Sequence, residues 1–159
     1  MNEPLQQVDR TYVRYRGRRL SYFSGCDYFR LASHPLVLKA ARDGVRKFGL
    51  NVAASRLTTG NHELYPKLEQ QLASFFDAEA ALLLPSGYLA APTVAQALAG
   101  NFSHALVDEM AHPALLDAAQ WLDCPILRFR HGEADHFVQS LARCGRGARP
   151  IVLTDGMFP

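Results

Sequence analysis

The chain has 159 residues, of which 48% are hydrophobic and 20% are charged, and its formal net charge is +2. This composition excludes a disordered chain, which would be poor in apolar residues and rich in net charge, and it allows one domain of ordinary size. The charge is too balanced to indicate nucleic-acid binding, and there is no apolar run of about 18 residues to predict a membrane span.

The cellular location is predicted from the N-terminus and the cysteines. The first 20 residues lack the apolar core of a signal peptide. The three cysteines, Cys26, Cys124 and Cys144, show neither the paired spacing of a zinc site nor the even number of a disulfide framework. We therefore expect reduced thiols and a cytoplasmic protein.

Residues 1 to about 24 are polar and rich in arginine, and we expect a solvated segment with one short extended piece near residues 20–23. Two acids, Glu3 and Asp9, partly offset the arginines. The arginines of this segment are Arg10, Arg14, Arg16, Arg18 and Arg19. A nucleic-acid-binding arm is the less favoured interpretation, since a few spaced arginines are usually a solvated surface.

The next part of the chain predicts two helices joined by a loop. Apolar residues recur at helical spacing after Pro35, which suits a first helical turn, and Gly49 follows the last of them. Residues 51–61 are polar and read as a loop. A second helical pattern begins near Leu64 and carries Pro66 in its first turns, where a missing N–H is tolerated.

From residue 80 onward, short apolar runs alternate with helical patterns. The sequence predicts strands over residues 80–84, 104–107, 125–129 and 151–154, and helices over residues 88–99, 113–122 and 134–144. This alternation is typical of an α/β fold with a parallel sheet covered on both faces. Ligands in such folds bind beyond the carboxyl ends of the strands.

The first candidate site follows the first of these strands, at Ser86, Gly87 and Tyr88. We expect Ser86 to cap the next helix and to leave the backbone N–H groups of Gly87 and Tyr88 free. Free amides at the positive end of a helix bind anions, and a phosphate monoester is the natural ligand. A plain cap and turn remains the alternative.

Three further candidates follow the later strands. His112 could stack on an aromatic ligand or simply lie near a helix start, and no second residue at helical spacing supports a metal site. Asp155 could bind a cofactor or cap a turn. The segment 131–133 is expected to be a structural turn, with Glu133 near a helix start, and Asp108 is expected to lie in a loop. Four common motifs are missing from the sequence, namely GxGxxG, GxxxxGK[ST], GxSxG and HExxH.

Six short segments together resemble the N-terminal part of the α-oxoamine synthases. They stand in the same order and spacing as that family's motifs NDYLGL…HP, GSR…SGNH…LE, SGYxAN, DxxxHASL, RFxHND and TEGVFSM. In this chain they occupy residues 26–35, 55–69, 86–91, 108–116, 128–133 and 154–158. Each motif is modest alone, and six in the right order are specific.

The resemblance implies a pyridoxal 5′-phosphate (PLP) enzyme with the fold-type-I transferase large domain, incomplete in this chain. It implies that Ser86, Gly87 and Tyr88 hold the cofactor phosphate, that His112 stacks over the cofactor ring and that Asp155 supports the cofactor region. Arg56 and Asn61 are implied as substrate contacts. The implied organisation is an N-terminal arm, helix and loop over residues 1–60, then the first part of the large domain over residues 61–159.

The implied activity is the condensation of an amino acid with an acyl-CoA with loss of CO2, by a homodimer. Family members bind the cofactor through a lysine, but the chain's three lysines, Lys39, Lys47 and Lys67, fall in predicted helices. The 159 residues alone are therefore expected to be inactive. The departures from the family pattern at Ala111 and Pro159 allow an aminotransferase or lyase of the same fold. A catalytically silent partner subunit is the third alternative.

Overall fold

The structure, a computed structural model, describes residues 3–7, 9 and 11–157. The chain divides into two compact units, residues 1–66 and residues 67–159. Each unit is described by itself below.

The first unit begins with a small antiparallel sheet of β1 (Gln6–Gln7), β2 (Tyr12–Tyr15) and β3 (Arg18–Ser21). Arg16 and Gly17 form the two-residue turn between β2 and β3, and both have positive φ (49° and 74°). Such turns match the twist of paired strands. The sequence predicted one extended piece near residues 20–23 and missed β1 and β2.

The N-terminal arginines take part in local contacts within this sheet. Arg16 lies 3.2 Å from Glu3, and Arg19 lies 3.3 Å from Asp9 and 3.8 Å from the centre of the Tyr12 ring. The predicted offset of the arginines by these two acids is therefore confirmed for both pairs. Arg10 lies outside the described residues.

A short 3-10 helix, η1 (Leu31–Ser33), leads into α1 (Pro35–Phe48). The ring of His34 caps α1 by accepting a hydrogen bond from the backbone N–H of Leu36 at 3.3 Å, and Pro35 occupies the first position. The helix ends at Gly49, whose φ of 76° suits glycine. The second predicted helix is α2 (Leu64–Phe75). Both predicted helices are confirmed.

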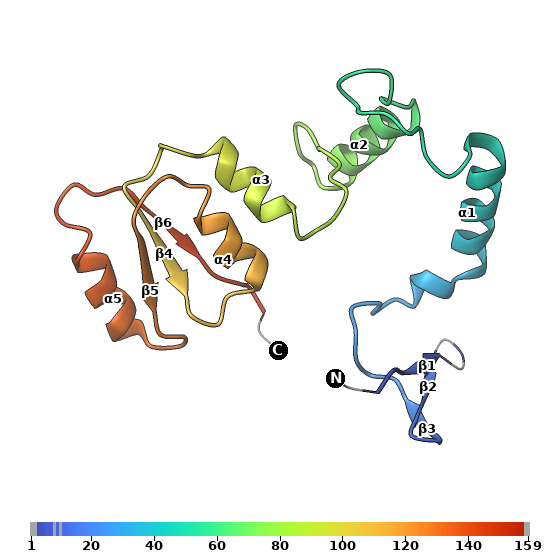
Figure 1. The fold of residues 1–159 in the computed structure, drawn as a ribbon, viewed down its shortest axis with the longest axis horizontal. Helices are drawn as coiled ribbons and strands as arrows, with labels where there is room; N and C mark the ends of the chain where they lie inside the picture. The colour runs from blue at the N-terminus through green and yellow to red at the C-terminus, as the bar shows by residue number, and fades with distance from the viewer. Residues whose placement is uncertain (1–2, 8, 10, 158–159) are drawn as a thin grey trace. The chain divides into compact units, whose positions relative to one another are not determined.

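The second unit contains a parallel sheet in the order β5-β4-β6 (Figure 1). Its strands are β4 (His104–Asp108), β5 (Ile126–Phe129) and β6 (Pro150–Leu153), joined through α4 (Pro113–Ala119) and α5 (Ala134–Ala142). The helix α3 (Ala90–Ala97) precedes β4. The predicted α/β fold with a parallel sheet is therefore confirmed.

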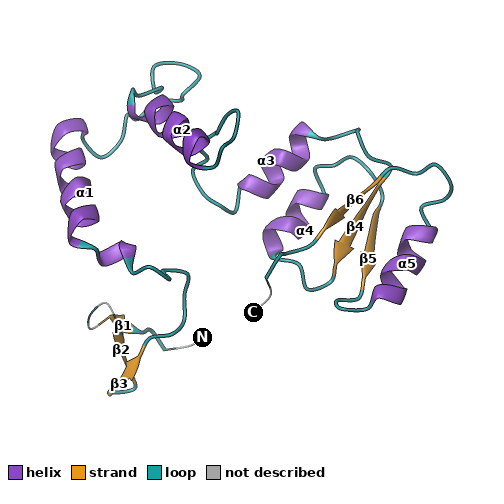
Figure 2. Ribbon diagram, turned by 180° about the vertical axis from the view of Figure 1, so that it is seen from behind, coloured by secondary structure: helices purple, strands orange, loops and turns teal. Residues whose placement is uncertain are grey.

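The core of this unit lies between β4 and the helices α3 and α4 (Figure 2). β4 is central, and Ala105 and Leu106 on it are fully buried, as expected for a strand covered on both faces. Alanines at the helix positions facing the core let α3 and α4 pack closely, and Ala118 is only 1% exposed. On the other side, Phe137 of α5 packs against Phe129 of β5 with ring centres 5.1 Å apart.

The predicted strand over residues 80–84 is wrong. This segment forms no strand, because none of the described strands pairs with it, and Leu82 on it is exposed. The backbone of this segment is bound by a side chain instead, since the N–H of Leu83 donates to the carboxylate of Glu69 on α2 at 2.9 Å.

Among the described residues, no helix is long and apolar enough to cross a membrane.

Candidate functional site

The carboxyl ends of β4, β5 and β6 lie at one edge of the sheet, because the three strands are parallel. Asp108 ends β4, His131 follows β5, and Thr154 and Asp155 follow β6. Three of the sequence-predicted residues, Tyr88, His112 and Asp155, form a continuous set of contacts in this unit.

The predicted phosphate cradle lies in the turn that precedes α3. Within the described part of the chain, the backbone N–H groups of Gly87 and Tyr88 donate to no protein group. A Cβ built on Gly87 would meet nothing within 4 Å, so a ligand could reach this backbone closely. The free amides agree with the prediction.

The predicted helix cap at Ser86 is wrong. α3 begins at Ala90, and its N-cap residue, Leu89, has no side-chain cap. The hydroxyl of Ser86 instead accepts from the backbone N–H of Leu89 at 3.4 Å. Ser86 therefore closes the turn that leads into the helix, and residues 88 and 89 belong to that turn.

His112 is the N-cap residue of α4 and is exposed. Its ring Nδ1 accepts from the backbone N–H of Ala114 at 3.1 Å, and Pro113 occupies the first helical position. In the neutral ring the proton therefore resides on Nε2. The rings of His112 and Tyr88 meet edge-on, with centres 6.1 Å apart and an interplanar angle of 66°. This contact joins two sequence-predicted residues that lie 24 positions apart.

Asp155 connects the end of β6 to the start of α4. Its Oδ2 accepts from the backbone N–H of His112 at 2.7 Å, and the residue is half-buried. Of the two roles considered from the sequence, the structure shows a cap-like role, because this bond satisfies an N–H at the helix entry. The bond also fixes His112 relative to the sheet.

Asp108 is the main site residue that sequence reasoning missed. It was expected in a loop, but it is the last residue of β4 and only 3% exposed. Its carboxylate accepts from Nδ1 of His131 at 2.9 Å, from the N–H of Met110 at 2.9 Å and from the hydroxyl of Thr154 at 3.1 Å. One carboxylate thus joins the ends of all three strands.

The electrostatics of Asp108 follow from this environment. Burial raises the pKa of the carboxyl, but the hydrogen bonds from His131, Met110 and Thr154 outweigh burial, and the net pKa lies below the ordinary value. The adjacent segment agrees with the predicted structural turn, since Glu133 is the N-cap residue of α5. His131 nevertheless has this additional contact with Asp108.

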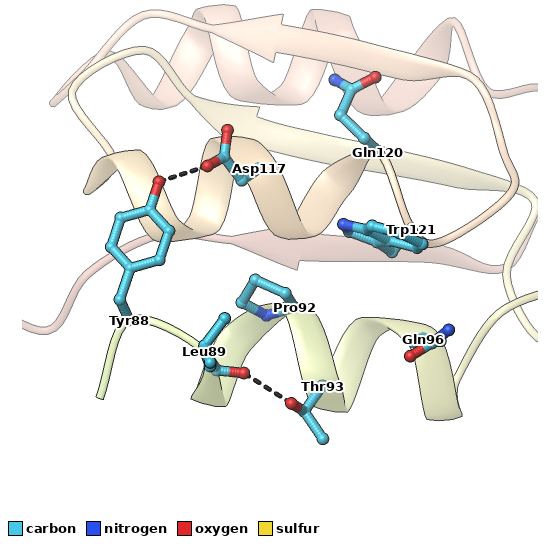
Figure 3. Close-up of a pocket in the computed structure, with 8 residues that line it drawn as sticks. All are labelled: Tyr88, Leu89, Pro92, Thr93, Gln96, Asp117, Gln120 and Trp121. Carbon is cyan, nitrogen blue, oxygen red and sulfur yellow. Dashed lines mark hydrogen bonds between the residues drawn. The ribbon is translucent and has the colours of Figure 1, made fainter. Parts of the chain in front are cut away.

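A second contact also escaped the sequence interpretation. The phenol of Tyr88 donates to the carboxylate of Asp117 on α4, 29 residues further along the chain (Figure 3). This hydrogen bond, together with burial and the negative charge of Asp117, raises the pKa of Tyr88. The pair lies at one end of an open cavity of about 550 Å³ between α3 and α4, which Trp121 also lines.

Arg56 and Asn61 belong to the first unit, in a loop folded around Ser55. The guanidinium Nε of Arg56 donates to Oδ1 of Asn61 at 3.1 Å, so the structure brings this predicted pair together. The carbonyl of Ser55 accepts from the N–H of Gly60 at 2.9 Å. A Cβ on Gly60 would lie 2.1 Å from the carbonyl oxygen of Ala54, so the loop requires glycine here.

A comparison with known protein families identifies the family of this chain. The sequence model of the family "Aminotransferase class I and II" matches residues 26–158, which is most of the chain. The chain belongs to the aminotransferase class I and II family. This match includes every site residue named above, in both units.

The curated relatives of this chain include proteins named 8-amino-7-oxononanoate synthase. The protein from Thioalkalivibrio sulfidiphilus (strain HL-EbGR7) is 40% identical over 142 residues, covering 89% of this chain and 36% of the relative. The one from Hahella chejuensis (strain KCTC 2396) is 38% identical over 146 residues, covering 92% and 37%. The chain therefore spans well under half the length of these relatives.

Solved structures share the fold. Serine palmitoyltransferase from Sphingomonas wittichii matches with a TM-score of 0.79 and 24% identity, over 92% of this chain and 37% of that one. Serine palmitoyltransferase from S. paucimobilis, solved with PLP and myriocin bound, matches with a TM-score of 0.78 and 25% identity over the same shares. These matches confirm the predicted fold-type-I class, of which this chain holds the N-terminal part.

The chain's lysines and the departure at Pro159 were also singled out from the sequence. Lys39 and Lys47 lie on α1 and Lys67 lies on α2, so the predicted helical placement of all three lysines is confirmed. The departure noted at Pro159 lies outside the described residues.

Proposed function

We propose that this chain supplies the phosphate cradle and the ring-stacking histidine of a PLP-dependent enzyme that condenses an amino acid with an acyl-CoA. The contact of Tyr88 with His112 carries the proposal, because it joins a set of free backbone amides to an exposed imidazole. The names of the curated relatives support this class of reaction.

The residues present fit the phosphate and the ring of the cofactor. The N–H groups of Gly87 and Tyr88 would donate to the phosphate, and the start of α3 adds the positive end of a helix dipole. The exposed ring of His112 would lie against the cofactor ring, held by its bond to Ala114. When bound, PLP supplies an electron sink that stabilises negative charge at the amino-acid Cα.

Asp155 would act indirectly in this arrangement. Its hydrogen bond to the backbone of His112 fixes the entry of α4, so that the imidazole is already oriented before a ligand arrives. In the first unit, Arg56 and Asn61 would contribute substrate contacts, with the guanidinium suited to a carboxylate. The cytoplasmic location, the homodimer and the division after residue 60 stay predictions.

The chain by itself is proposed to be inactive, because its three lysines lie on α1 and α2 rather than at the strand ends. The first test is therefore made on the native gene product, whose intact mass shows how much chain accompanies these residues. The assay follows free CoA thiol released from an acyl-CoA in the presence of amino acid and PLP. Release that requires all three components supports the proposal.

The alternatives give different results in the same assay. Conversion of the amino acid without any acyl-CoA would contradict the condensation and indicate an aminotransferase or lyase. A silent partner would bind PLP but turn over no amino acid, and adding a second subunit would restore turnover. The separate 159-residue chain serves as the control and is expected to release no thiol.

A further inference from the structure

The turn that holds the proposed phosphate cradle is weakly constrained by its own backbone. The N–H of Leu89 reaches the carbonyl of Ser86 at 3.2 Å and its hydroxyl at 3.4 Å, and the N–H of Ala90 reaches the carbonyl of Gly87 at 3.2 Å. These distances lie at or beyond the upper end of the usual range for hydrogen bonds. Gly87 adds conformational freedom, and residues 86–89 are all exposed. The local bonds alone therefore leave the two amide donors poorly fixed.

The side chain of Tyr88 provides the missing constraint from outside the turn. Figure 3 shows its phenol reaching across the cavity from the turn before α3 to Asp117 on α4. α4 is anchored in the core through Ala118, which is 1% exposed, so Asp117 offers the turn a rigid attachment point. The amide of Tyr88 and its phenol belong to one residue, so fixing the phenol also limits the motion of the amide.

We propose that Asp117 is a positioning residue, which holds the backbone amides of Gly87 and Tyr88 in place for a phosphate by accepting the phenol hydrogen bond. The inference rests on the proposed function, because it assigns Asp117 to the same cradle. Asp117 itself touches no ligand in this arrangement.

Two physical effects of Asp117 oppose each other, and this makes the proposal testable. A carboxylate near the cradle repels a phosphate dianion, whereas its hydrogen bond to the phenol orders the amides. If charge dominated, Asp117→Asn would tighten phosphate binding. If the hydrogen bond dominates, Asn keeps an acceptor and weakens binding slightly, and Asp117→Ala removes the acceptor and weakens binding more.

The experiment compares the affinities of the native gene product for PLP and for pyridoxal, which lacks the phosphate, by equilibrium dialysis. The variants are Asp117→Ala, Asp117→Asn, Tyr88→Phe and the double variant Tyr88→Phe/Asp117→Ala. Gln120→Ala is the matched control, because Gln120 lines the same cavity and is the C-cap residue of the same helix. We expect the Ala and Phe variants to weaken PLP binding about threefold to fivefold, the range open to an exposed contact.

Four further results are expected. The double variant binds PLP no more weakly than either single variant, because both remove the same hydrogen bond. The variants bind pyridoxal as tightly as the wild-type protein does. Gln120→Ala binds PLP as tightly as the wild-type protein does. In the absence of ligand, absorbance titration of the tyrosines shows that Asp117→Ala lowers the pKa of Tyr88, which reports the hydrogen bond directly.

The failures are distinguishable. If the wild-type protein binds PLP no better than pyridoxal, the proposed phosphate cradle itself is wrong, and the positioning role falls with it. If the wild-type protein prefers PLP but all variants bind it equally, or if Asp117→Asn tightens binding, the cradle stands and only the role of Asp117 is overturned. Equal losses for PLP and pyridoxal would likewise refute a role specific to the phosphate.

Discussion

Replacement of Asp108 by alanine should strongly destabilise the second unit. The carboxylate is 3% exposed and accepts from Met110, His131 and Thr154, so it joins the ends of β4, β5 and β6. Asp108→Ala removes the common acceptor of these three donors. The strands remain paired along their lengths, but their carboxyl ends lose the group that links them.

The magnitude follows from the exposure of the donors. A hydrogen bond to a charged group contributes roughly 1.5–3 kcal/mol. Here Met110, His131 and Thr154 are exposed and regain water after the substitution, which reduces the loss at each. Removing a buried charge also relieves its desolvation. We therefore expect the free energy of unfolding to fall by about 2–3 kcal/mol, near the upper end of ordinary point substitutions.

Urea unfolding of the purified protein measures this change, with Trp121, the single tryptophan of the chain, as a fluorescent reporter in the same unit. Asp108→Asn should cost about 1 kcal/mol, because the amide oxygen still accepts from Met110. The control is Asp123→Asn, at an exposed position with φ of 54° that asparagine tolerates. An Asp108→Ala variant within about 0.5 kcal/mol of the wild type would refute the reasoning.

Three other predictions rest on the same structure. Gly87→Val should leave the urea midpoint unchanged, because a Cβ there meets nothing within 4 Å, yet weaken PLP binding measured by dialysis; unchanged affinity would contradict the cradle. Gly60→Ala should speed hydrogen exchange of the residue-60 amide, because its Cβ would lie 2.1 Å from a backbone oxygen, whereas Gly44→Ala, with open space around it, should not. The stabilisation from Asp108 should be complete above its unfolded pKa of about 3.9 and lost as pH falls through its lowered folded pKa, so acid should destabilise the wild type more than Asp108→Asn in urea titrations; equal slopes would contradict this.

The helices and three of the four predicted strands were accessible from sequence because their signals are local. Pro35 and Gly49 bracket α1, and the apolar run of β4 is typical of a buried parallel strand. The segment 80–84 is also a short apolar run, made of alanine and leucine, but it has no partner among the described strands. Strand formation depends on pairing, which a single apolar run does not specify.

The hairpin of the N-terminal sheet could have been predicted from the sequence. Arg16-Gly17 is a two-residue turn with glycine second, flanked by the alternating residues of β2, and this pattern predicts a hairpin. The histidine caps at His34 and His112 were missed because histidine is not among the preferred N-cap residues.

The contacts that build the site were out of reach for a physical reason. Tyr88 and Asp117 lie 29 positions apart, and Asp108 and Thr154 lie 46 apart, so their meeting depends on the strand order and on helix packing. Sequence reasoning identified Tyr88, His112 and Asp155 because each follows a predicted strand or turn. Asp117 lies within a helix and Asp108 within a strand, where a charged residue gives no local sign of its partner.

Two consecutive residues at the end of β6 explain how the sheet sets the position of the proposed cofactor site. Thr154 donates to the buried carboxylate of Asp108 at the end of β4, while Asp155 accepts from the backbone of His112 at the start of α4. Because neighbouring side chains leave an extended backbone in opposite directions, one residue is bound to the sheet and the next to the helix. The imidazole of His112 is thus held through Asp155 to a strand end that Asp108 already fixes. The orientation of the site therefore depends on the buried carboxylate of Asp108, although that residue is not itself placed against the ligand.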